Sequence, residues 1–265
     1  MDDEGDRRIR TLTGGQTFCA DGFIWATVSG PWTGERALSE KRQVWEERWG
    51  QQQGEDFHWY LREAPKELVA LLEGANRPRG AALDLGCGNG VATAYLAQHF
   101  DLAVGLDIAS AALRQARDLA RGQGVGVALV VAEAPVLPFR DQAFGLVFDR
   151  GCLQGIPGPA WPVYFREVER VLAPGGMLQL YVSKPGKRSA RPRSSQRVKS
   201  ALRRLLGTRR GRGKRKREPP SFLSPPLIRR MMSPSMQEVA MERFDFRTTS
   251  GENRHFVYAL FKKPA

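Results

Sequence analysis

Short apolar runs alternate with segments of helical period through the middle of the chain. Runs of strand length lie at 81–85, 102–106, 127–132, 144–148 and 176–182. Helical stripes, with apolar residues three and four positions apart, follow at 91–97, 109–119 and 164–172. Near the C-terminus, apolar and polar residues alternate at 239–248 and 255–262, around a turn at 250–253. Strands that alternate with helices predict an α/β sheet of mostly parallel strands, and the last two segments predict a hairpin.

A glycine-rich turn joins the first strand to the first helix. It begins two residues after Asp84 and has the spacing G-x-G-x-G, with glycines at Gly86, Gly88 and Gly90. Strand, glycine turn and helix in this order bring backbone N–H groups up to a nucleotide-like ligand. The Asp84 carboxylate would repel a pyrophosphate and attract an ammonium group, and Val91 stands where a dinucleotide-binding turn has its third glycine. The turn therefore argues against NAD and favours a nucleoside that carries an amino acid.

Acidic residues also end the next two strands. Asp107 follows Asp84 by 23 residues, close to the spacing of about 20 residues at which an acid binds ribose hydroxyls. In the alternative interpretation, Asp107 caps the helix that follows it. Glu133 ends the third strand and precedes Ala134 and a Leu-Pro-Phe sequence at 137–139. The alternative for Glu133 is a solvated acid at a strand end.

Two further segments complete a pattern that resembles the class I S-adenosylmethionine-dependent methyltransferases. One reads Phe-Gly-Leu-Val-Phe-Asp-Arg-Gly at 144–151, and the other is the helix and strand around Pro-Gly-Gly at 174–176. The resemblance covers roughly 57–183 and resumes at about 221–265. It implies a Rossmann-like α/β fold, in which a seven-stranded mixed sheet, mostly parallel with the last strand antiparallel, carries helices on both faces. It also implies S-adenosyl-L-methionine as the cofactor.

The same resemblance implies a set of cofactor contacts. Asp107 would accept hydrogen bonds from the ribose hydroxyls, and Ile108 would lie against the adenine. Glu133 would accept a hydrogen bond from the adenine amino group. The full set is Asp84, Gly86, Cys87, Gly88, Gly90, Asp107, Ile108, Glu133, Ala134 and Asp149. Three positions depart from the family pattern, which usually has Asp at Glu133, Asp at Gly145 and, in many members, His at Gln154. A role for histidine at position 154 therefore cannot be transferred.

The sequence divides into five predicted parts. An extension without clear periodicity occupies 1–34, and an aromatic-rich helical lid occupies 35–76. The cofactor-binding core is expected at 77–183, followed by a basic insert at 184–220. A C-terminal helix and hairpin at 221–265 complete the sheet. The aromatic residues of the lid have a second interpretation, in which they only cover the sheet edge.

The positive charge of the protein lies in the insert. The chain has a net charge of +13, but 184–217 contains 16 Lys or Arg and no acid, which leaves 25 basic and 28 acidic residues elsewhere. Apolar residues at helical spacing in 198–206 predict a short basic amphipathic helix. This helix packs on its own domain, binds RNA phosphates, or attaches to an anionic membrane surface. The segment 184–217 has no aromatic residue, which argues against base stacking.

The remaining composition narrows the classes of function. Three widely spaced cysteines at 19, 87 and 152 fit no zinc pattern, and with no signal sequence they indicate a cytoplasmic protein without a bound metal. Candidates for a catalytic role are His58, Asp149 and Arg150. We expect methyl transfer to an O, N or S atom of a small molecule. The alternatives are an RNA methyltransferase that uses the insert, and a non-catalytic cofactor-binding or scaffold protein.

Overall fold

The computed structural model describes residues 13, 17–20, 23–26, 35–51, 57, 60–183, 223–247 and 253–265. Within these residues the strands form one mixed sheet in the order β1-β2-β5-β4-β3-β6-β7-β9-β8. Seven of them match the predicted strands: β3 (Ala81–Leu85), β4 (Leu102–Asp107), β5 (Ala128–Val131), β6 (Phe144–Arg150), β7 (Leu172–Ser183), β8 (Gln237–Arg247) and β9 (Asn253–Lys262). Strands β3 to β7 are parallel, and β9 runs antiparallel to both β7 and β8. The predicted seven-stranded, mostly parallel sheet is confirmed.

Two additional strands extend the sheet beyond β5. Strands β1 (Thr17–Ala20) and β2 (Phe23–Ala26) form an antiparallel pair, and β2 runs parallel to β5. Both lie in the segment 1–34, for which the sequence predicted no element. A strand of four residues is too short for alternation to be distinguished from chance, because only two of its side chains point to each face.

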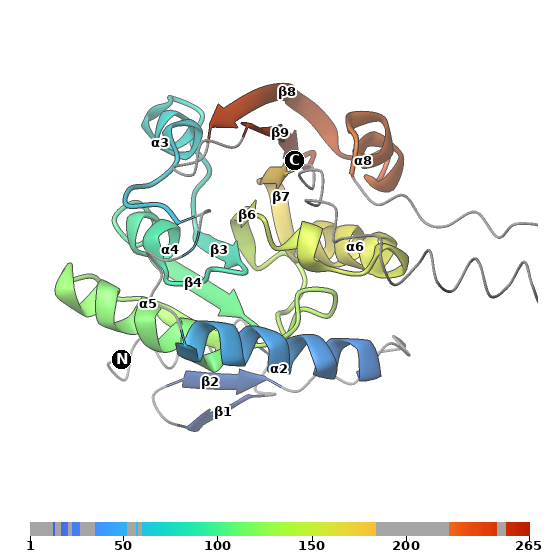
Figure 1. Cartoon of the computed structure of the whole chain (residues 1–265). Coiled ribbons are helices and arrows are strands. Elements are labelled where there is room, and N and C mark those ends of the chain that lie inside the picture. The colour runs from blue at the N-terminus through green and yellow to red at the C-terminus, as the bar shows by residue number, and fades with distance from the viewer. Residues whose placement is uncertain are drawn as a thin grey trace, which may run out of the picture.

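Helices cover both faces of the sheet (Figure 1). On one face, α3 (Lys66–Glu73), α4 (Val91–Leu96) and α5 (Ser110–Gly122) follow the chain order. On the other lie α6 (Trp161–Val171) and α8 (Pro225–Met231). Alternation along β3 separates the two sides, since Ala82 packs with Leu68 and Leu96 while Leu83 packs in the cluster of α6. Apolar side chains thus pack on both faces of the sheet, as expected for a parallel sheet with two covered faces.

The strand order reverses beside β3. From β3 the chain proceeds outward to β4 and β5, and then returns to place β6 on the other side of β3. Consequently, the segment after β3 leads to α4 on one face, whereas the segment after β6 leads through the short 3₁₀ turns η2 (Leu153–Gly155) and η3 (Gly158–Ala160) to α6 on the opposite face. A crevice opens between diverging connections of this kind at the carboxyl ends of the strands.

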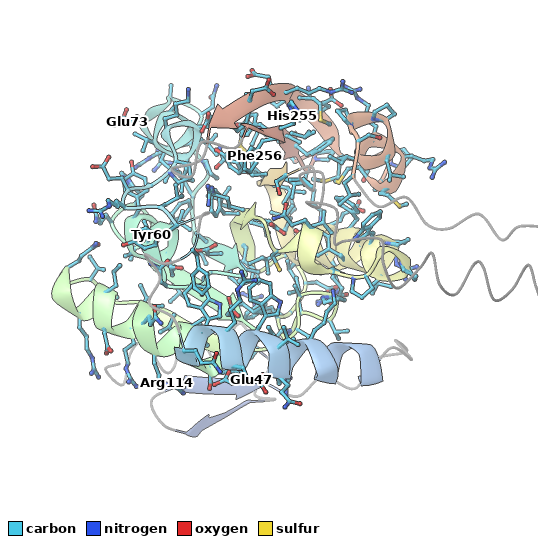
Figure 2. All side chains as sticks on the ribbon, viewed as in Figure 1. Glu47, Tyr60, Glu73, Arg114, His255 and Phe256 are labelled. Atoms are coloured by element: carbon cyan, nitrogen blue, oxygen red, sulfur yellow. The ribbon has the colours of Figure 1, made fainter. Side chains whose placement is uncertain are left out.

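The helix α2 (Glu35–Gln51) lies against α5 near the edge that carries β1 and β2 (Figure 1). Its Glu46 carboxylate accepts hydrogen bonds from the Ser110 hydroxyl at 2.7 Å and from the Ala111 backbone N–H at 3.1 Å. Figure 2 shows Arg114 of α5 beside α2, where it forms an ion pair with Glu46 at 3.4 Å. Glu46 therefore joins α2 to the first turn of α5, where a carboxylate is favoured by the helix dipole.

Gly145, one of the departures from the family pattern, has a structural reason. A Cβ at this position in β6 would lie 1.8 Å from the backbone oxygen of Arg79. That separation is far below any van der Waals contact, so the backbone before β3 can pass β6 only where position 145 has no side chain.

Candidate functional site

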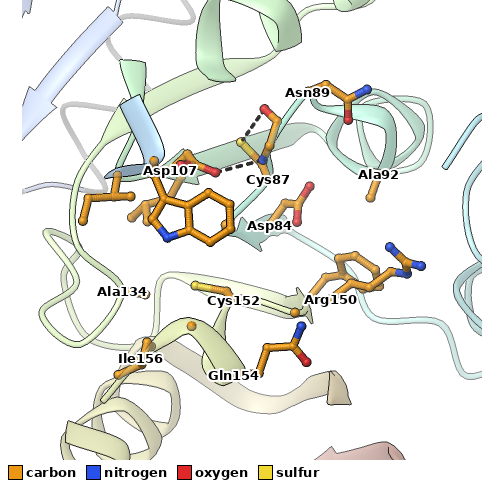
Figure 3. A pocket seen from close by; sticks show the side chains of 18 of the residues that line it. Asp84, Cys87, Asn89, Ala92, Asp107, Ala134, Arg150, Cys152, Gln154 and Ile156 are labelled. Atoms are coloured by element: carbon orange, nitrogen blue, oxygen red, sulfur yellow. Dashed lines mark hydrogen bonds between the residues drawn. The ribbon is translucent and has the colours of Figure 1, made fainter. Parts of the chain in front are cut away.

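A cavity of about 520 Å³ occupies the crevice at the carboxyl ends of the central strands. Eight of the ten predicted cofactor contacts line it: Asp84, Gly86, Cys87, Gly88, Asp107, Ile108, Glu133 and Ala134. Figure 3 shows how these residues converge from the ends of β3, β4 and β5. The volume falls in the range of about 300–1,000 Å³ that is typical of sites for small molecules.

The glycine turn places bare backbone against the cavity. Gly86 and Gly88 have φ angles of +65° and +55°, in the left-handed region that favours glycine. A Cβ at Gly86 would lie 2.7 Å from the Cβ of Cys152, and one at Gly88 would lie 3.0 Å from the Trp49 ring. Both glycines are therefore required by close approach as well as by backbone conformation, and neither adds a side chain to the ligand space.

Asp84 lies at the base of the cavity and is 3% exposed. Its carboxylate accepts a hydrogen bond from the Thr93 hydroxyl at 2.6 Å. Burial is the main cause that raises the pKa of Asp84 to about 7; the Thr93 hydrogen bond opposes this shift, and the nearby carboxylates of Asp149 and Asp107 add to it. A cationic ligand at this point would favour the ionised form of Asp84, because an opposite charge lowers the pKa of a carboxyl.

Asp107 holds the start of α5, as one of its two interpretations predicted, and it also lines the cavity, while binding of the ribose stays a prediction. One carboxylate oxygen accepts the Gly88 N–H at 3.0 Å, and the other accepts the Ala109 N–H at 2.9 Å at the start of α5. The side chain also lines the cavity, and burial raises its pKa to about 6. Asp107 thus ties the glycine turn to α5 while its remaining lone pairs face the ligand space.

Glu133 meets α2 across the cavity mouth. Its carboxylate lies 3.3 Å from the Arg42 guanidinium, and the two side chains are 24% and 47% exposed. The neighbouring Ala134 is buried and contributes to the cavity wall together with Ile108. The three residues that the resemblance assigned to the adenine therefore lie together at one end of the cavity.

Two predicted cofactor contacts, Asp149 and Gly90, are not among the residues that line the cavity, so contact with the cofactor stays a prediction for both. The Asp149 side chain is 0% exposed, and its carboxylate accepts the Cys152 N–H at 2.9 Å, the Leu153 N–H at 3.0 Å and the Tyr164 hydroxyl at 2.6 Å. Burial raises its pKa to about 7. Asp149 therefore holds the start of η2.

Gly90 has a packing role. Its φ is +80°, and a Cβ there would lie 2.6 Å from the Cβ of Ala116 on α5. This position starts α4 and allows α4 and α5 to approach each other closely. The third glycine of the turn is thus explained by helix packing.

The catalytic candidates separate in the structure. Arg150 lines the cavity, and burial lowers its pKa against the charges of Tyr181, Glu67 and Asp84, which raise it. His58 lies outside the described residues. The other two histidines lie elsewhere, since His99 packs on Tyr95 and the exposed His255 pairs with Asp245. Arg150 is the one of the three candidates that the structure places at the cavity.

The two cysteines of the cavity wall are not activated. Burial raises the pKa of Cys87 well above its usual value, and Asp84 adds to the effect. Burial and the Asp149 carboxylate do the same for Cys152. Since the thiolate is the reactive form, both are suited to be small wall residues rather than nucleophiles.

Several residues of the cavity come from distant segments. The aromatic residues Trp45, Trp49 and Tyr60 line it, so the expected covering of the site by the N-terminal region extends to the cavity itself. Lys41, Ser183 and Phe256 also line it and had no sequence signal. The Lys41 ammonium donates a hydrogen bond to the Gly155 carbonyl oxygen in η2, and burial lowers its pKa.

Comparison with known proteins supports the fold and the class of enzyme. The family model described as a methyltransferase domain matches residues 82–176, and no curated protein sequence matches significantly. One similar structure comes from a description of the conversion of a disulfide bond into a thioacetal group during echinomycin biosynthesis. It has a TM-score of 0.62 at 21% identity, over 84% of this chain and 92% of that chain.

Two other similar structures contain S-adenosylhomocysteine. The 1,6-didemethyltoxoflavin-N1-methyltransferase of Burkholderia thailandensis has a TM-score of 0.59 at 16% identity, over 94% of this chain and 98% of that chain. The N-methyltransferase NodS of Bradyrhizobium japonicum has a TM-score of 0.54 at 15% identity, over 87% of this chain and 98% of that chain.

The matched residues 82–176 run from β3 through the glycine turn and β6 into β7, and so include most of the cavity wall. Within the described part of the chain, no helix is both long and apolar enough to cross a membrane. Residues 82–176 therefore form a methyltransferase domain, and its fold is shared with S-adenosylmethionine-dependent methyltransferases.

Proposed function

We propose that the enzyme transfers the methyl group of S-adenosylmethionine to an O, N or S atom of a small molecule. The observation that carries this proposal is the extent of the cavity. It reaches from the residues expected to contact the cofactor to a second group, formed by Lys41, Gln154, Ser183 and Phe256. A space enclosed by α2 and the strand ends suits an acceptor that fits beside the cofactor. One similar structure holds a small heterocycle, 1,6-didemethyltoxoflavin, together with S-adenosylhomocysteine.

The residues present fit S-adenosylmethionine. The glycine turn offers a cradle that side chains would fill, and two buried carboxylates with raised pKa values lie beside it. A ligand with a sulfonium and an ammonium group would offset the cost of ionising these carboxylates together. Asp84 would lie near the amino group and Asp107 near the ribose hydroxyls. Glu133 and Ala134 would bind the adenine edge, and Arg150 would pair with the carboxylate.

S-adenosylmethionine supplies a methyl group that its sulfonium already makes electrophilic. The task of the chain is then to align the acceptor and to keep water away from it. Aromatic side chains of α2 and the segment after it cover the cavity, and the wall residues come from rigid strand ends. Correct alignment of two reactants can lower a barrier by about 7–11 kcal/mol, so positioning alone supplies much of the rate.

Calorimetric titration with S-adenosylmethionine tests the proposal. We expect the wild type to bind the cofactor and Asp107→Ala to bind it at least tenfold more weakly, since the variant removes an acceptor from the ligand space. Asp118→Ala is a matched control, because this carboxylate is 70% exposed on α5. Absence of binding by the wild type would exclude the proposed activity. A screen of small-molecule pools with labelled cofactor would then identify the acceptor.

The alternative acceptor, RNA, depends on the segment 184–217, which lies outside the described residues and stays a prediction. RNA binding across a salt series, with and without 184–217, would test it, since each neutralised phosphate steepens the log–log slope by about 0.7–0.9. The non-catalytic alternative rested on Gly145 and Gln154. Because Gly145 is required by the approach of the Arg79 carbonyl, that departure does not indicate a lost activity.

A further inference from the structure

Gln154 lies in the wall of the cavity with its amide held in one orientation. Its Oε1 accepts the backbone N–H of Ser183 at 2.7 Å and the Ser183 hydroxyl at 2.5 Å. A backbone N–H can only donate, so the oxygen of the amide must be the atom that faces β7. The amide nitrogen therefore faces the cavity, and Figure 3 shows it turned toward the space between Cys152 and Arg150.

The turn that carries Gln154 is held at both ends. On one side, the Asp149 carboxylate binds the backbone N–H groups of Cys152 and Leu153, and the Tyr164 hydroxyl supports that carboxylate. On the other side, the Lys41 ammonium binds the Gly155 carbonyl. The amide nitrogen of Gln154 is thus positioned by contacts with α2, β6, α6 and β7, which lowers the entropy cost of using it to bind a ligand.

The chemistry of this end of the cavity differs from that of the glycine turn. Gln154 Nε2 and the neighbouring Lys41 Nζ carry only hydrogen-bond donors, whereas Asp84, Asp107 and Glu133 at the other end carry acceptors. A ligand group with lone pairs or negative charge complements the donors of Gln154 and Lys41. An ammonium group at the same point would meet unpaired donors and the like charge of Lys41. The acceptor is therefore held beside Gln154 by an electron-rich group.

We propose that Gln154 selects the methyl acceptor by donating a hydrogen bond from Nε2 to a carboxylate, or an equivalent oxygen anion, on that molecule. This inference rests on the proposed function, since it assigns the acceptor to the part of the cavity that Gln154 lines. It predicts that the substrate is an acidic small molecule, and that amines lacking such a group are poor ligands.

Gln154→Glu tests this assignment without releasing the turn. One carboxylate oxygen can still accept both hydrogen bonds from Ser183, while the other replaces the donors that face the cavity with an acceptor. The probes are benzoate and benzylamine, titrated by NMR into protein saturated with S-adenosylhomocysteine. We expect the wild type to bind benzoate at least tenfold more tightly than benzylamine. The variant should lose at least tenfold in benzoate affinity, as expected for a hydrogen bond to a charged group.

Two controls separate selection from structure. Gln98→Glu makes the same change at an exposed position that does not line the cavity, and it should leave both probes unaffected. Thermal melting and S-adenosylhomocysteine affinity of Gln154→Glu should match the wild type.

The outcomes distinguish this inference from the proposed function. If S-adenosylhomocysteine does not bind the wild type, the proposed function fails. If it binds, and benzoate either does not bind or binds Gln154→Glu as tightly as the wild type, only the role of Gln154 is overturned. Once an acceptor is known, the factor by which Gln154→Glu raises its KM should be at least ten times the factor by which the variant lowers kcat.

Discussion

The two ends of the cavity are built in different ways. The acidic end consists of Asp84, Asp107 and Glu133, and each of them stands at or just after the end of a parallel strand. The amide end consists of Lys41, Gln154 and Ser183, whose contacts join residues 114 and 29 positions apart. At the acidic end the strand order alone brings the groups together. At the amide end, contacts between α2, η2 and β7 are needed.

The largest expected effect concerns the glycine turn of the acidic end. Gly86→Ala adds a methyl group 2.7 Å from the Cys152 Cβ at a φ of +65°. We expect a loss of about 3 kcal/mol in the free energy of unfolding, from backbone strain and overpacking together, and loss of cofactor binding. Denaturant titration and calorimetry would measure both.

Gly124→Ala is the matched control for this change. Its φ is +68°, but nothing lies within 4 Å of the added Cβ, so it should cost only about 1 kcal/mol from strain. Equal losses in the two variants would show that close packing around Gly86 contributes nothing.

The next effect concerns the support of the amide end. Tyr164→Phe removes the 2.6 Å hydrogen bond to the buried Asp149 carboxylate, which should lower the free energy of unfolding by about 2 kcal/mol. Benzoate affinity should fall severalfold because η2 is loosened, while S-adenosylhomocysteine affinity stays constant. Tyr95→Phe, at a partly buried position on α4, should change stability by less than about 0.5 kcal/mol. Equal loss of both ligands in Tyr164→Phe would contradict the separation of the two ends.

A smaller effect is the pH dependence of the acidic end. The pKa values of Asp84 and Asp107 are raised to about 7 and about 6, so the ligand-free protein takes up protons that a cationic ligand must release. Affinity for S-adenosylmethionine should therefore rise about tenfold from pH 5.5 to 8. Because these folded-state pKa values exceed the unfolded ones, the same groups should make the ligand-free protein less stable as pH rises through this window.

Calorimetry in buffers of different ionisation enthalpy would measure the proton release directly. Asp84→Asn should remove much of the pH dependence, whereas Asp118→Asn, at an exposed carboxylate, should preserve it. An affinity for S-adenosylmethionine that is constant or falls between pH 5.5 and 8 would contradict the assignment of a cationic ligand to this end.

The smallest effect is expected for the ion pair between Arg42 of α2 and Glu133 of the acidic end. Arg42→Gln removes the partly exposed ion pair with Glu133, which should change the free energy of unfolding by less than about 1 kcal/mol. Cofactor affinity should change by less than about threefold, since Glu133 keeps its place after β5. A tenfold change would show that this pair controls access to the cavity, and it can be measured by the same titration.

Much of the fold could be predicted because its signals are local. The seven core strands each carry an apolar run or alternation, and the helices between them have a clear period. Strands β1 and β2 could not be predicted, since four residues carry too little periodicity. The enclosure of Asp149 could not be predicted for a different reason: its position at a strand end resembles that of Asp84, and only the packing of Tyr164 and η2 shows that its carboxylate is enclosed.

The sequence by itself determined the acidic end of the cavity and the class of ligand it takes. Its carboxylates and glycines stand within a few residues of the strand ends, and parallel strands necessarily bring those ends to one edge of the sheet. Only the tertiary structure decided the amide end. Lys41 arrives there from a distant helix, and the direction in which Gln154 presents its donors depends on a backbone N–H that another strand supplies.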